Sequence, residues 1–494
     1  MENKVKVLFA AAECAPIIKV GGLGDVAGEL PRKLMELRAD VRVVIPGNRD
    51  INVPSVYKGD FPVKIGFRTE TCIVREVLKS PVPTWIIDNY HYFGRPGVYG
   101  HWDDGERFAF FCLSIFEMLL KFDFKPDVVH LNDWHTAPLS MLIRENEREQ
   151  PFLRDTAIVY TIHNLEYQGI SGRNVFDLFN VKDVVFKTDK VEYYGCFNAM
   201  KAGINYADII NGVSKTGTTQ MLTSKYGFGL EGVLKNRKSA LRGVVNGIDI
   251  DFWNPENDKL IYTPFNKDNL SGKKENKKRL QKELGLDSSD GPLFGVVSRL
   301  VPNKGMDILE GAAHNIARSN GQFVLLGSGE KYYENAFMRL MERYPGKVSV
   351  NLEFNNELAH KIYAASDIFL MPSRHEPCGI SQLIAMRYGS VPIVHKTGGL
   401  ADTVIDTGRN KEKGTGFTFA GYSLESFLKA IKRALSLYEN SKEWVSLVKR
   451  AMSRDSSWES SAAEYMKLYE EARTLNRKRK TKGRKKAIEE KGEG

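Results

Sequence analysis

Short runs of β-branched and other apolar residues alternate along this chain with longer amphipathic stretches. The runs occupy residues 5–11, 41–46, 127–133, 157–164 and 207–214 in the first half, and 293–300, 322–329, 348–354, 367–372 and 391–395 in the second. Continuous apolar strands separated by helices are typical of a parallel sheet that is covered on both faces. The pattern therefore predicts an α/β chain made of two Rossmann-like domains.

The alternation pauses once, and this pause sets the predicted domain limits. The stretch LRGVVNGIDIDFWNP, from Leu241, leads into a polar, lysine-rich segment before the pattern restarts. We predict an N-terminal domain over 1–247, a C-terminal domain over 248–454, a helix over 455–475 that crosses back to the first domain, and a basic, disordered tail over 476–494. Ligands of such sheets bind beyond the carboxyl ends of the strands, so two facing domains should form a deep interdomain cleft.

Composition and cysteine usage predict the cellular compartment. The 494 residues are 42% hydrophobic and 27% charged, which is enough apolar material for two ordinary domains. No apolar run approaches the roughly 20 residues that span a bilayer, so we expect no membrane partner. The five cysteines are odd in number, scattered and without a CxxC pair, which argues against a disulfide framework or a structural zinc site. A reduced, cytoplasmic location is expected.

The formal net charge of +10 resembles a nucleic-acid signal until its position is considered. Much of it lies after Thr474, in LNRKRKTKGRKKAIEEKGEG, whereas the rest of the chain is close to neutral. Such a run is most often a solvated extension, with binding to a polyanion or a membrane surface as the lesser alternative. We therefore expect no nucleic-acid partner.

The first candidate for chemistry is KVGGLGDVAG, Lys19 to Gly28, a glycine-rich turn that opens a helix. Glycines let the backbone approach a phosphate, the helix N-terminus supplies N–H donors, and Lys19 adds a positive charge. The spacing is not the dinucleotide fingerprint GxGxxG, which should follow a strand directly. A plain tight turn with close helix packing remains an equal alternative.

Two further loops follow predicted strands of the second half. In SRLVPNKG, Arg299 and Lys304 suit a diphosphate leaving group, although a solvated basic loop is the simpler interpretation. In SRHEPCGISQ, Glu376 can bind sugar hydroxyls, and the residues from Gly379 to Ser381 can offer backbone N–H groups to a phosphate. A carboxylate before proline would otherwise indicate only a capping or solvated role.

Histidines and a pair of aspartates give weaker signals. His163 directly follows an apolar strand and should face the ligand, whereas His135 at a helix start is as well explained by capping or a core contact. Asp249 and Asp251 form a literal DxD that hard cations could use. Since Arg299 and Lys304 already supply positive charge, we expect no metal and no cofactor.

The motifs together resemble a known family. KVGGLGDV, HLNDWHTA, TIHNLEYQG, VVNGID, SRLVPNKG, SRHEPCGISQ and KTGGLADTV occur in this order over nearly the whole chain. The set closely resembles the bacterial glycogen synthases and plant starch synthases that use ADP-glucose, glycosyltransferases of family 5. The resemblance implies a two-domain GT-B fold and transfer of glucose, with retention of configuration, to the non-reducing 4-hydroxyl of an α-1,4-glucan, with release of ADP.

The resemblance also assigns roles to residues. It implies that Lys19 and Gly22 approach the distal phosphate and sugar, and that Asp25 contacts the donor or acceptor sugar. The implied catalytic set is His163, Glu376, Arg299, Lys304 and Asp133. The other implied substrate contacts are Asn164, Asn246, Phe354, Cys378, Gly379, Ile380 and Ser381. It places the glycine-rich loop and acceptor side in the N-terminal domain and the nucleotide-sugar site in the C-terminal domain.

Two residues depart from the family's usual motifs, and three alternative functions remain open. Ile384 stands where many related enzymes have the second glutamate of an E-x7-E pair, and Phe354 stands where the family often has a tyrosine that stacks on adenine. The nearest alternative is a glycosyltransferase that uses UDP-glucose or another acceptor. An NAD-dependent oxidoreductase would need the missing GxGxxG, and a non-catalytic glucan-binding or nucleic-acid-binding protein would leave Glu376 and Lys304 unexplained.

Overall fold

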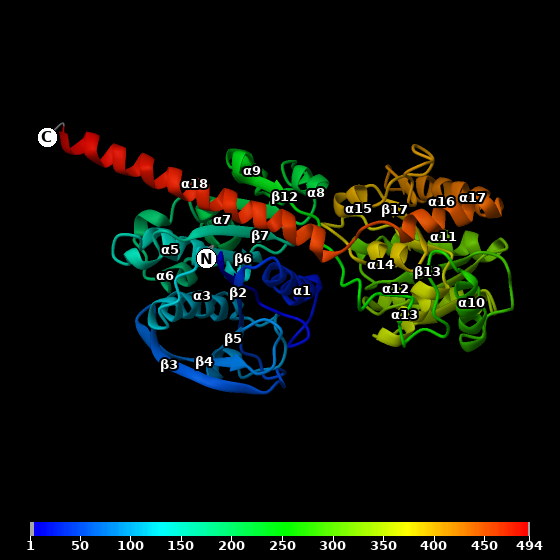
Figure 1. Cartoon of the computed structure of the whole chain (residues 1–494), viewed down its shortest axis with the longest axis horizontal. Helices are drawn as coiled ribbons and strands as arrows, with labels where there is room; N and C mark the ends of the chain where they lie inside the picture. Colours follow the sequence, from blue (N-terminus) through cyan, green and yellow to red (C-terminus); the bar gives the residue numbers. More distant parts are fainter. Residues whose placement is uncertain (1–3, 493–494) are drawn as a thin grey trace. The chain divides into compact units, whose positions relative to one another are not determined.

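The computed structural model describes the backbone of residues 4–492 and the side chains of residues 4–481. The chain divides into two compact units (Figure 1). Unit 1 comprises residues 1–213, 218–244 and 458–494, and unit 2 comprises residues 214–217 and 245–457. The chain therefore enters unit 2 from unit 1 and returns to unit 1 for its last helix.

Unit 1 contains a nine-stranded sheet in the order β12-β11-β7-β6-β1-β2-β5-β4-β3. Its strands are β1 (Lys6–Ala10), β2 (Asp40–Pro46), β3 (Ser55–Ile65), β4 (Arg68–Val77), β5 (Thr84–Asp88), β6 (Val128–Asn132), β7 (Ala157–Ile162), β11 (Ile209–Gly212) and β12 (Leu241–Gly243). Neighbours from β12 to β5 are parallel, whereas β4 is antiparallel to both β3 and β5. The five strands expected in the first half are all present.

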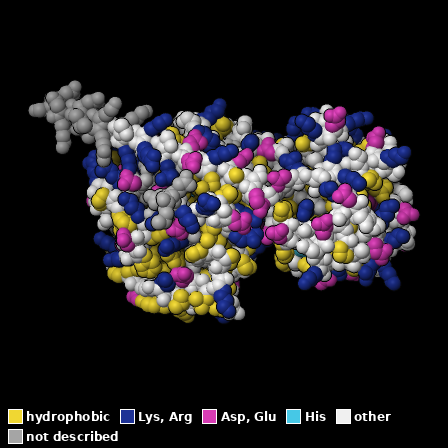
Figure 2. All heavy atoms as spheres, viewed as in Figure 1, with side chains coloured by type: hydrophobic (Ala, Val, Ile, Leu, Met, Phe, Trp, Pro, Cys, Tyr) yellow, Lys and Arg dark blue, Asp and Glu magenta, His cyan; other side chains and the backbone are white. Residues whose placement is uncertain are grey.

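The β3–β4 hairpin and β5 were not among the expected strands. β3 alternates exposed and buried positions toward its end, which is the pattern of a strand with one solvated face, and such a pattern lacks a continuous apolar run. Tyr57 and Phe67 remain exposed on this hairpin. Figure 2 shows hydrophobic side chains gathered over this region, at the lower left of the view, while Lys and Arg are intermixed with Asp and Glu elsewhere on that face.

Helices cover both faces of the unit 1 sheet. One buried cluster joins the sheet to α3, α5 and α7, and a second joins the opposite face to α1 and α18. The helices are α1 (Gly22–Glu36), α2 (Tyr90–Phe93), α3 (Asp104–Lys121), α4 (Asp133–Thr136), α5 (Pro138–Glu145), α6 (Arg173–Asp177), α7 (Ala199–Tyr206), α9 (Glu231–Asn236) and α18 (Trp458–Gly492). A small antiparallel sheet contains β8 (Ile170–Ser171), β10 (Cys196–Asn198) and β9 (Glu192–Tyr193). Short 3-10 turns are η1 (Pro151–Leu153), η2 (Asp183–Val185) and η3 (Lys238–Ala240).

Unit 2 is a six-stranded parallel sheet in the order β15-β14-β13-β16-β17-β18. Its strands are β13 (Leu293–Val297), β14 (Gln322–Leu326), β15 (Val348–Asn351), β16 (Ile368–Met371), β17 (Val391–His395) and β18 (Phe417–Phe419). Its helices are α10 (Ser271–Glu283), α11 (Met306–Arg318), α12 (Lys331–Arg343), α13 (Asn356–Ala365), α14 (Ser381–Arg387), α15 (Gly398–Thr403), α16 (Leu424–Tyr438) and α17 (Ser441–Met452), with the 3-10 turn η4 (Pro302–Lys304). α8 (Lys215–Gln220) spans the point where the chain changes unit.

Strand order reverses between β13 and β16 in unit 2, and between β1 and β6 in unit 1. Ligands of doubly wound sheets bind beyond the carboxyl ends of strands at such reversals, because the loops there diverge and leave a crevice. Both expected Rossmann-like sheets are therefore present, each with one topological switch point.

The C-terminal helix differs from the sequence expectation. α18, the red helix of Figure 1, contacts α1, β6, β7 and β11 of unit 1 and continues to Gly492, where a disordered tail was expected from residue 476. Lysine, arginine and glutamate are good helix formers, and extending an existing helix requires no new nucleus. Asn476 and Arg479 also bond to unit 1, so the first turns of the basic segment are held in place. Residues 493–494 of the expected tail lie outside the described residues.

Within residues 4–492, no helix is long and apolar enough to cross a membrane.

Candidate active site

The switch point of unit 1 brings together three residues that follow neighbouring strands. Asp133 comes directly after β6 with a φ of 57°, and its Oδ1 accepts the backbone N–H of His163 at 2.7 Å and of Asn164 at 3.3 Å. Asn132 Nδ2 donates to the carbonyl of Ala10 at 3.0 Å, which leaves Asn132 Oδ1 to pair with His163 Nε2 at 2.9 Å. His163 therefore carries its ring proton on Nε2, and Nδ1 holds the lone pair.

Burial sets the charge of this group. It lowers the pKa of the His163 imidazole to about 3, so the ring is neutral at physiological pH. Burial also raises the pKa of the Asp133 carboxyl to about 7, and the nearby Glu13 carboxylate raises it further, against the two N–H groups that lower it. At neutral pH the His163 ring is therefore neutral, while the Asp133 carboxyl is close to its titration midpoint.

The glycine-rich loop is held from below by Glu13, a residue that the sequence analysis did not select. Its buried carboxylate accepts the backbone N–H groups of Val20 and Gly21, the latter at 2.9 Å, and the hydroxyl of Tyr99 at 3.3 Å. A Cβ added at Gly24 would lie 3.0 Å from Glu13 Oε2. The loop is therefore held in place by a carboxylate. Gly24 is small because a side chain at this position would contact that carboxylate. A glutamate in the irregular segment after β1 gives no signal of this role in a single sequence.

The exposed side of the same loop is open. A side chain at Gly22 would meet no atom within 4 Å, so a ligand could approach this backbone closely. Lys19 Nζ lies 2.7 Å from Asp25 Oδ1, and both side chains are partly exposed. The two expected contact residues thus pair with each other across the start of α1.

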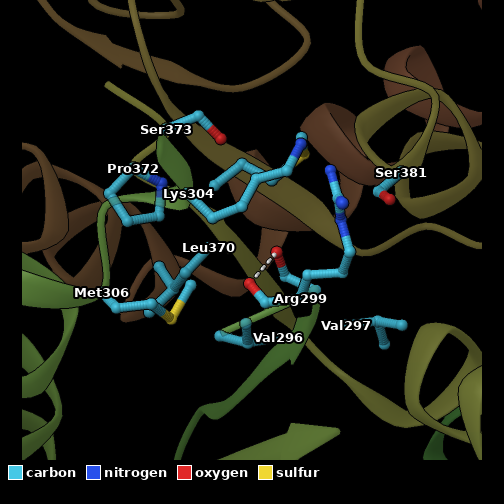
Figure 3. A pocket seen from close by; sticks show the side chains of 11 residues that line it. Val296, Val297, Arg299, Lys304, Met306, Leu370, Pro372, Ser373 and Ser381 are labelled. Carbon is cyan, nitrogen blue, oxygen red and sulfur yellow. Dashed lines mark hydrogen bonds between the residues drawn. The ribbon is translucent and has the colours of Figure 1, made fainter. Parts of the chain in front are cut away.

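The switch point of unit 2 contains a pocket of about 180 Å³. It is lined by Val296, Val297, Ser298, Arg299, Lys304, Met306, Leu370, Met371, Pro372, Ser373 and Ser381. Figure 3 shows the long side chains of Arg299 and Lys304 extending into it, between Ser373 and Ser381. Apolar strand ends form its floor, and the two cations stand where an anionic ligand would gain most from a partly desolvated charge.

Glu376 is tied to this pocket by an ion pair. Lys304 Nζ lies 2.6 Å from Glu376 Oε2, which also accepts the Ser373 hydroxyl at 3.1 Å. Lys304 is placed by Gly305, whose φ of 77° is left-handed and whose added Cβ would lie 2.2 Å from the carbonyl oxygen of Pro372. Only glycine lets this loop pass so close to the end of β16.

The loop that follows Glu376 is supported from α15. Gly379 has a φ of 73°, and the backbone N–H of Gly399 donates to the carbonyls of Glu376 at 3.2 Å and Pro377 at 3.1 Å. A Cβ on Gly398 would lie 1.9 Å from the carbonyl oxygen of Glu376. KTGGLADTV was part of the expected motif set, and this contact supplies the packing reason for its glycines.

The other residues of unit 2 that were expected to contact substrate differ in their exposure and hydrogen bonding. Cys378 is buried, and burial raises the pKa of its thiol to about 12. The side-chain oxygen of the buried Asn246 has no hydrogen-bond partner among the described residues. Ile380 is partly buried against the core, whereas Phe354, between β15 and α13, is 95% exposed and able to stack on a planar ligand.

Packing decides between the alternatives that the sequence left open for His135. His135 is buried among the rings of Tyr99, Phe108 and Trp134, and burial lowers the pKa of its imidazole to about 3. It is therefore a core residue. In the aromatic loop from Asp88 to Gly100, Tyr92 is buried, so that part of the loop packs the core.

The DxD turn makes local contacts. Asp249 Oδ1 accepts the backbone N–H groups of Asp251 at 3.0 Å and Phe252 at 3.1 Å. Over the part of the chain that the structure describes, no three His, Cys, Asp or Glu residues are grouped as a metal site.

Comparisons with known proteins agree with both halves of the fold. Residues 6–236 match the family described as "Starch synthase catalytic domain", and residues 276–450 match "Glycosyl transferases group 1". Proteins called glycogen synthase from Moorella thermoacetica and Desulforamulus reducens are 42% and 44% identical over 96% and 94% of this chain, and each is covered over 98% of its length.

Solved structures extend this likeness. The catalytic domain of starch synthase IV from Arabidopsis thaliana, bound to ADP and acarbose, is 33% identical with a TM-score of 0.90, covering 96% of this chain and 100% of that one. A sucrose-phosphate synthase from Thermosynechococcus elongatus has a TM-score of 0.61 at 16% identity, a likeness of fold alone.

The two parallel-sheet units and these matches define a GT-B glycosyltransferase. Within that class the chain belongs to the family of glycogen and starch synthases, and it is a glucosyltransferase.

Proposed function

We propose that this chain transfers glucose from ADP-glucose to the non-reducing 4-hydroxyl of an α-1,4-glucan, with retention of configuration and release of ADP. The names of the bacterial relatives support the polymer, and the ADP and acarbose bound to the Arabidopsis starch synthase support the nucleotide and the glucan. A donor with UDP in place of ADP, or another acceptor, is the alternative.

The pocket at the switch point of unit 2 carries this proposal. Arg299 and Lys304 extend into it from the loop after β13 and can neutralise the diphosphate of the donor. An arginine can donate to two phosphate oxygens at once, and a lysine beside it supplies a compact charge. Stabilising ADP as it leaves lowers the barrier, because negative charge on the leaving oxygen is greatest in the transition state. Ser381 also lines the pocket, and the backbone of Gly379 and Ile380, which precede it in the chain, is proposed to donate to the same diphosphate.

Glu376 is proposed to bind the hydroxyls of the transferred glucose. Its carboxylate is already oriented by Lys304 and by the Ser373 hydroxyl, so it is held in place before the sugar arrives. Phe354 is proposed to stack on adenine, with Asn246 and Cys378 as further contacts of the donor.

Residues of unit 1 are proposed to act on the sugar and acceptor. His163, held neutral by burial, and Asp133, which orients the backbone of His163 and Asn164, are assigned to the reacting carbon. Lys19, Gly22 and Asp25 are assigned to the distal phosphate and sugar. Because donor and product share the α-configuration, we propose front-face attack with the leaving phosphate accepting the proton of the acceptor hydroxyl.

We also propose a cytoplasmic location. The five cysteines are free thiols, and four of them are buried. Paired cysteines are usual where proteins fold under oxidising conditions, so unpaired buried thiols favour a reducing compartment.

Replacing Lys304 or Arg299 by alanine tests the proposed leaving-group site. Each change should lower kcat by about 10²- to 10³-fold, the typical effect of losing one preorganised donor to a developing negative charge. The loss should appear in kcat more than in KM, because the charge is larger in the transition state than in bound substrate. Initial rates of ADP release on a glycogen primer measure it.

Lys331, an exposed lysine of unit 2 outside the pocket, is the matched control, and Lys331→Ala should keep wild-type kcat. Near-wild-type kcat in both pocket variants would remove the proposed site. Activity abolished by EDTA and restored by Mg²⁺, together with Asp249→Ala as damaging as Lys304→Ala, would assign the diphosphate to the DxD turn.

A further inference from the structure

A chain of buried polar side chains connects α18 to the sheet of unit 1. The hydroxyl of Tyr469 lies 2.8 Å from Nδ1 of His130 on β6, and Nε2 of the same ring lies 2.7 Å from the hydroxyl of Thr161 on β7. Both ring nitrogens of His130 are therefore hydrogen-bonded. All three side chains are buried, so each of these bonds is shielded from water.

A second tyrosine of α18 closes the network through β11. Asn211 Oδ1 accepts the backbone N–H of Val244 at 3.1 Å, which fixes its amide so that Nδ2 is the donor. Nδ2 donates to the hydroxyls of Tyr465 at 3.0 Å and Thr161 at 3.3 Å. Two tyrosines one helical turn apart thus reach three adjacent parallel strands.

The network lies one layer below the polar group at the switch point. His130 is two residues before Asn132 on β6, so these two side chains point to the same side of the sheet, and His163 follows the end of β7, two residues after Thr161. Thr161 is also the direct strand partner of Asn132. The network and the residues that orient His163 therefore share the same two strands.

The residues around the network exclude water, so losing any one of its hydrogen bonds is costly. Phe9 packs edge-on against His130 at 4.6 Å, and buried apolar residues of β1, α1 and α18 enclose the group. A ring nitrogen that loses its partner here cannot be satisfied by bulk water, so the ring would shift or admit a water molecule.

We propose that Tyr465 and Tyr469 of α18 are positioning residues for glucosyl transfer, acting through His130, Thr161 and Asn211 to hold Asn132 and His163 in register. The inference rests on the proposed role of His163. A purely structural network would stabilise the fold without any specific effect on turnover. The experiment must distinguish this alternative from a positioning role.

The test begins with Tyr469→Phe, which removes only the hydroxyl. We expect kcat to fall about tenfold while the KM values for ADP-glucose and glycogen change less than twofold, because alignment of the reacting groups is lost and substrate contacts are kept. Tyr465→Phe should lower kcat in the same direction. If both phenylalanine variants retain kcat within twofold of wild type, the proposal is overturned.

The matched control is Asn476→Ala on the same helix. Asn476 Nδ2 donates to the carbonyls of Asp155 at 3.0 Å and Thr156 at 3.2 Å, at the opposite end of β7 from His163. This variant should lose melting temperature and keep kcat. An equal loss of kcat in Asn476→Ala would mean that any weakening of α18 slows the enzyme, and that the tyrosines have no positioning role.

A combined variant of three network residues separates positioning from stability. Removing both partners of a buried hydrogen bond in favour of apolar groups can be nearly neutral for folding. Because His130 also bonds to Thr161, Thr161→Val is added to His130→Leu and Tyr469→Phe, and this combination should regain melting temperature relative to Tyr469→Phe while kcat stays low. Recovery of kcat together with melting temperature would overturn the proposal. His163→Ala keeps the two hypotheses apart, since its full activity would refute the role of His163 itself.

Discussion

Asp133 combines a left-handed backbone with a buried carboxyl group. Residues other than glycine rarely adopt a positive φ, and aspartate and asparagine are among the few that do so at small cost. Here the turn lets one carboxylate oxygen accept two consecutive N–H groups after β7. An amide oxygen could accept the same two N–H groups. Any strength that the negative charge of Asp133 adds to these two bonds is opposed by the cost of burying that charge.

We predict that Asp133→Asn stabilises the protein at neutral and alkaline pH. The pKa of the folded-state carboxyl is raised to about 7, so the folded protein binds a proton that the unfolded chain has already lost. Stability from this group is fully present below the unfolded pKa of about 4 and is lost as pH rises to 7. The gain in melting temperature from Asp133→Asn should therefore be small at pH 5 and large at pH 8.

Asp123 provides the control for this comparison. It is exposed at the end of α3 with a φ of 48°, so Asp123→Asn makes the same change in the same backbone conformation without burial. Its effect on melting temperature measures what the change from carboxyl to amide does in this backbone conformation without burial. A gain at Asp133 that is equal at pH 5 and pH 8 would show that its carboxyl is ionised over the whole range.

Motifs in the sequence selected His163, Lys304 and Glu376, because each follows an apolar strand in a chain with a recognisable motif order. The supports of these residues were missed. Glu13 bonds to a backbone N–H group eight residues further along the chain, and Ser373 stands in a selected motif that gave it no role, because no periodicity or composition marks such a contact. The sequence thus predicts which loops carry chemistry and leaves open what holds them.

At the scale of elements, α18 has two parts with different roles. Trp458, Tyr465 and Tyr469 are buried in the unit 1 core, whereas the residues after Asn476 make ion pairs at the surface. Exposed ion pairs contribute roughly 0 to 1 kcal/mol each, while burying a large side chain contributes about 1.5 to 3 kcal/mol. The stability of α18 on unit 1 therefore comes from its first half.

We predict that ending the chain after Asn476 lowers the melting temperature by less than about 3 °C and changes turnover on a soluble primer less than twofold. The lost contacts are the pairs of Arg479 with Glu147 and of Lys480 with Asp155. Thermal melts and initial rates of the two chain lengths measure the effect.

Ending the chain after Ser461 supplies the contrast, because it removes the buried tyrosines and should abolish cooperative folding of unit 1. A large loss of turnover on truncation after Asn476 would show that the basic segment contributes to catalysis.

Strand prediction succeeded for most strands that are buried on both faces, although the buried β5 was missed, and it failed for the hairpin strands that have one solvated face. β1, β7 and β14 are continuous apolar runs and were expected, whereas β3 and β4 alternate and were not. The end of α18 failed for another reason. A basic, polar sequence predicts a solvated segment whether or not the segment is helical. Here the segment is helical because it continues a helix that is packed on unit 1.

At the scale of the whole molecule, each unit places its polar residues at the switch point of its own sheet. This arrangement could be predicted, because both the alternation of strands and helices and the position of polar residues after strands are visible in the sequence. The GT-B class and the family followed from the order of motifs, and the likeness to an ADP-bound starch synthase agrees with them.

We predict that the enzyme prefers ADP-glucose to UDP-glucose by at least tenfold in kcat/KM, which requires about 1.4 kcal/mol of differential transition-state binding. An exposed phenylalanine can stack on the larger face of adenine better than on uracil. Initial rates with both donors on one glycogen primer measure the ratio.

Phe354→Ala should narrow this preference, whereas Tyr332→Ala, at an exposed aromatic on α12, should leave it unchanged. Equal or reversed use of the donors in the wild-type protein would refute the donor assignment while leaving the leaving-group site in place.

The return of the chain to unit 1 has a consequence for how the protein is made. The core that contains His130 and Phe9 is completed by α18, yet the ribosome synthesises all of residues 245–457 before that helix. At elongation rates of about 5 to 20 residues per second, the uncovered sheet face waits on the order of tens of seconds. During that interval nascent unit 1 exposes an apolar surface that chaperones or premature pairing could engage, and its native state is reached only after the last helix leaves the ribosome.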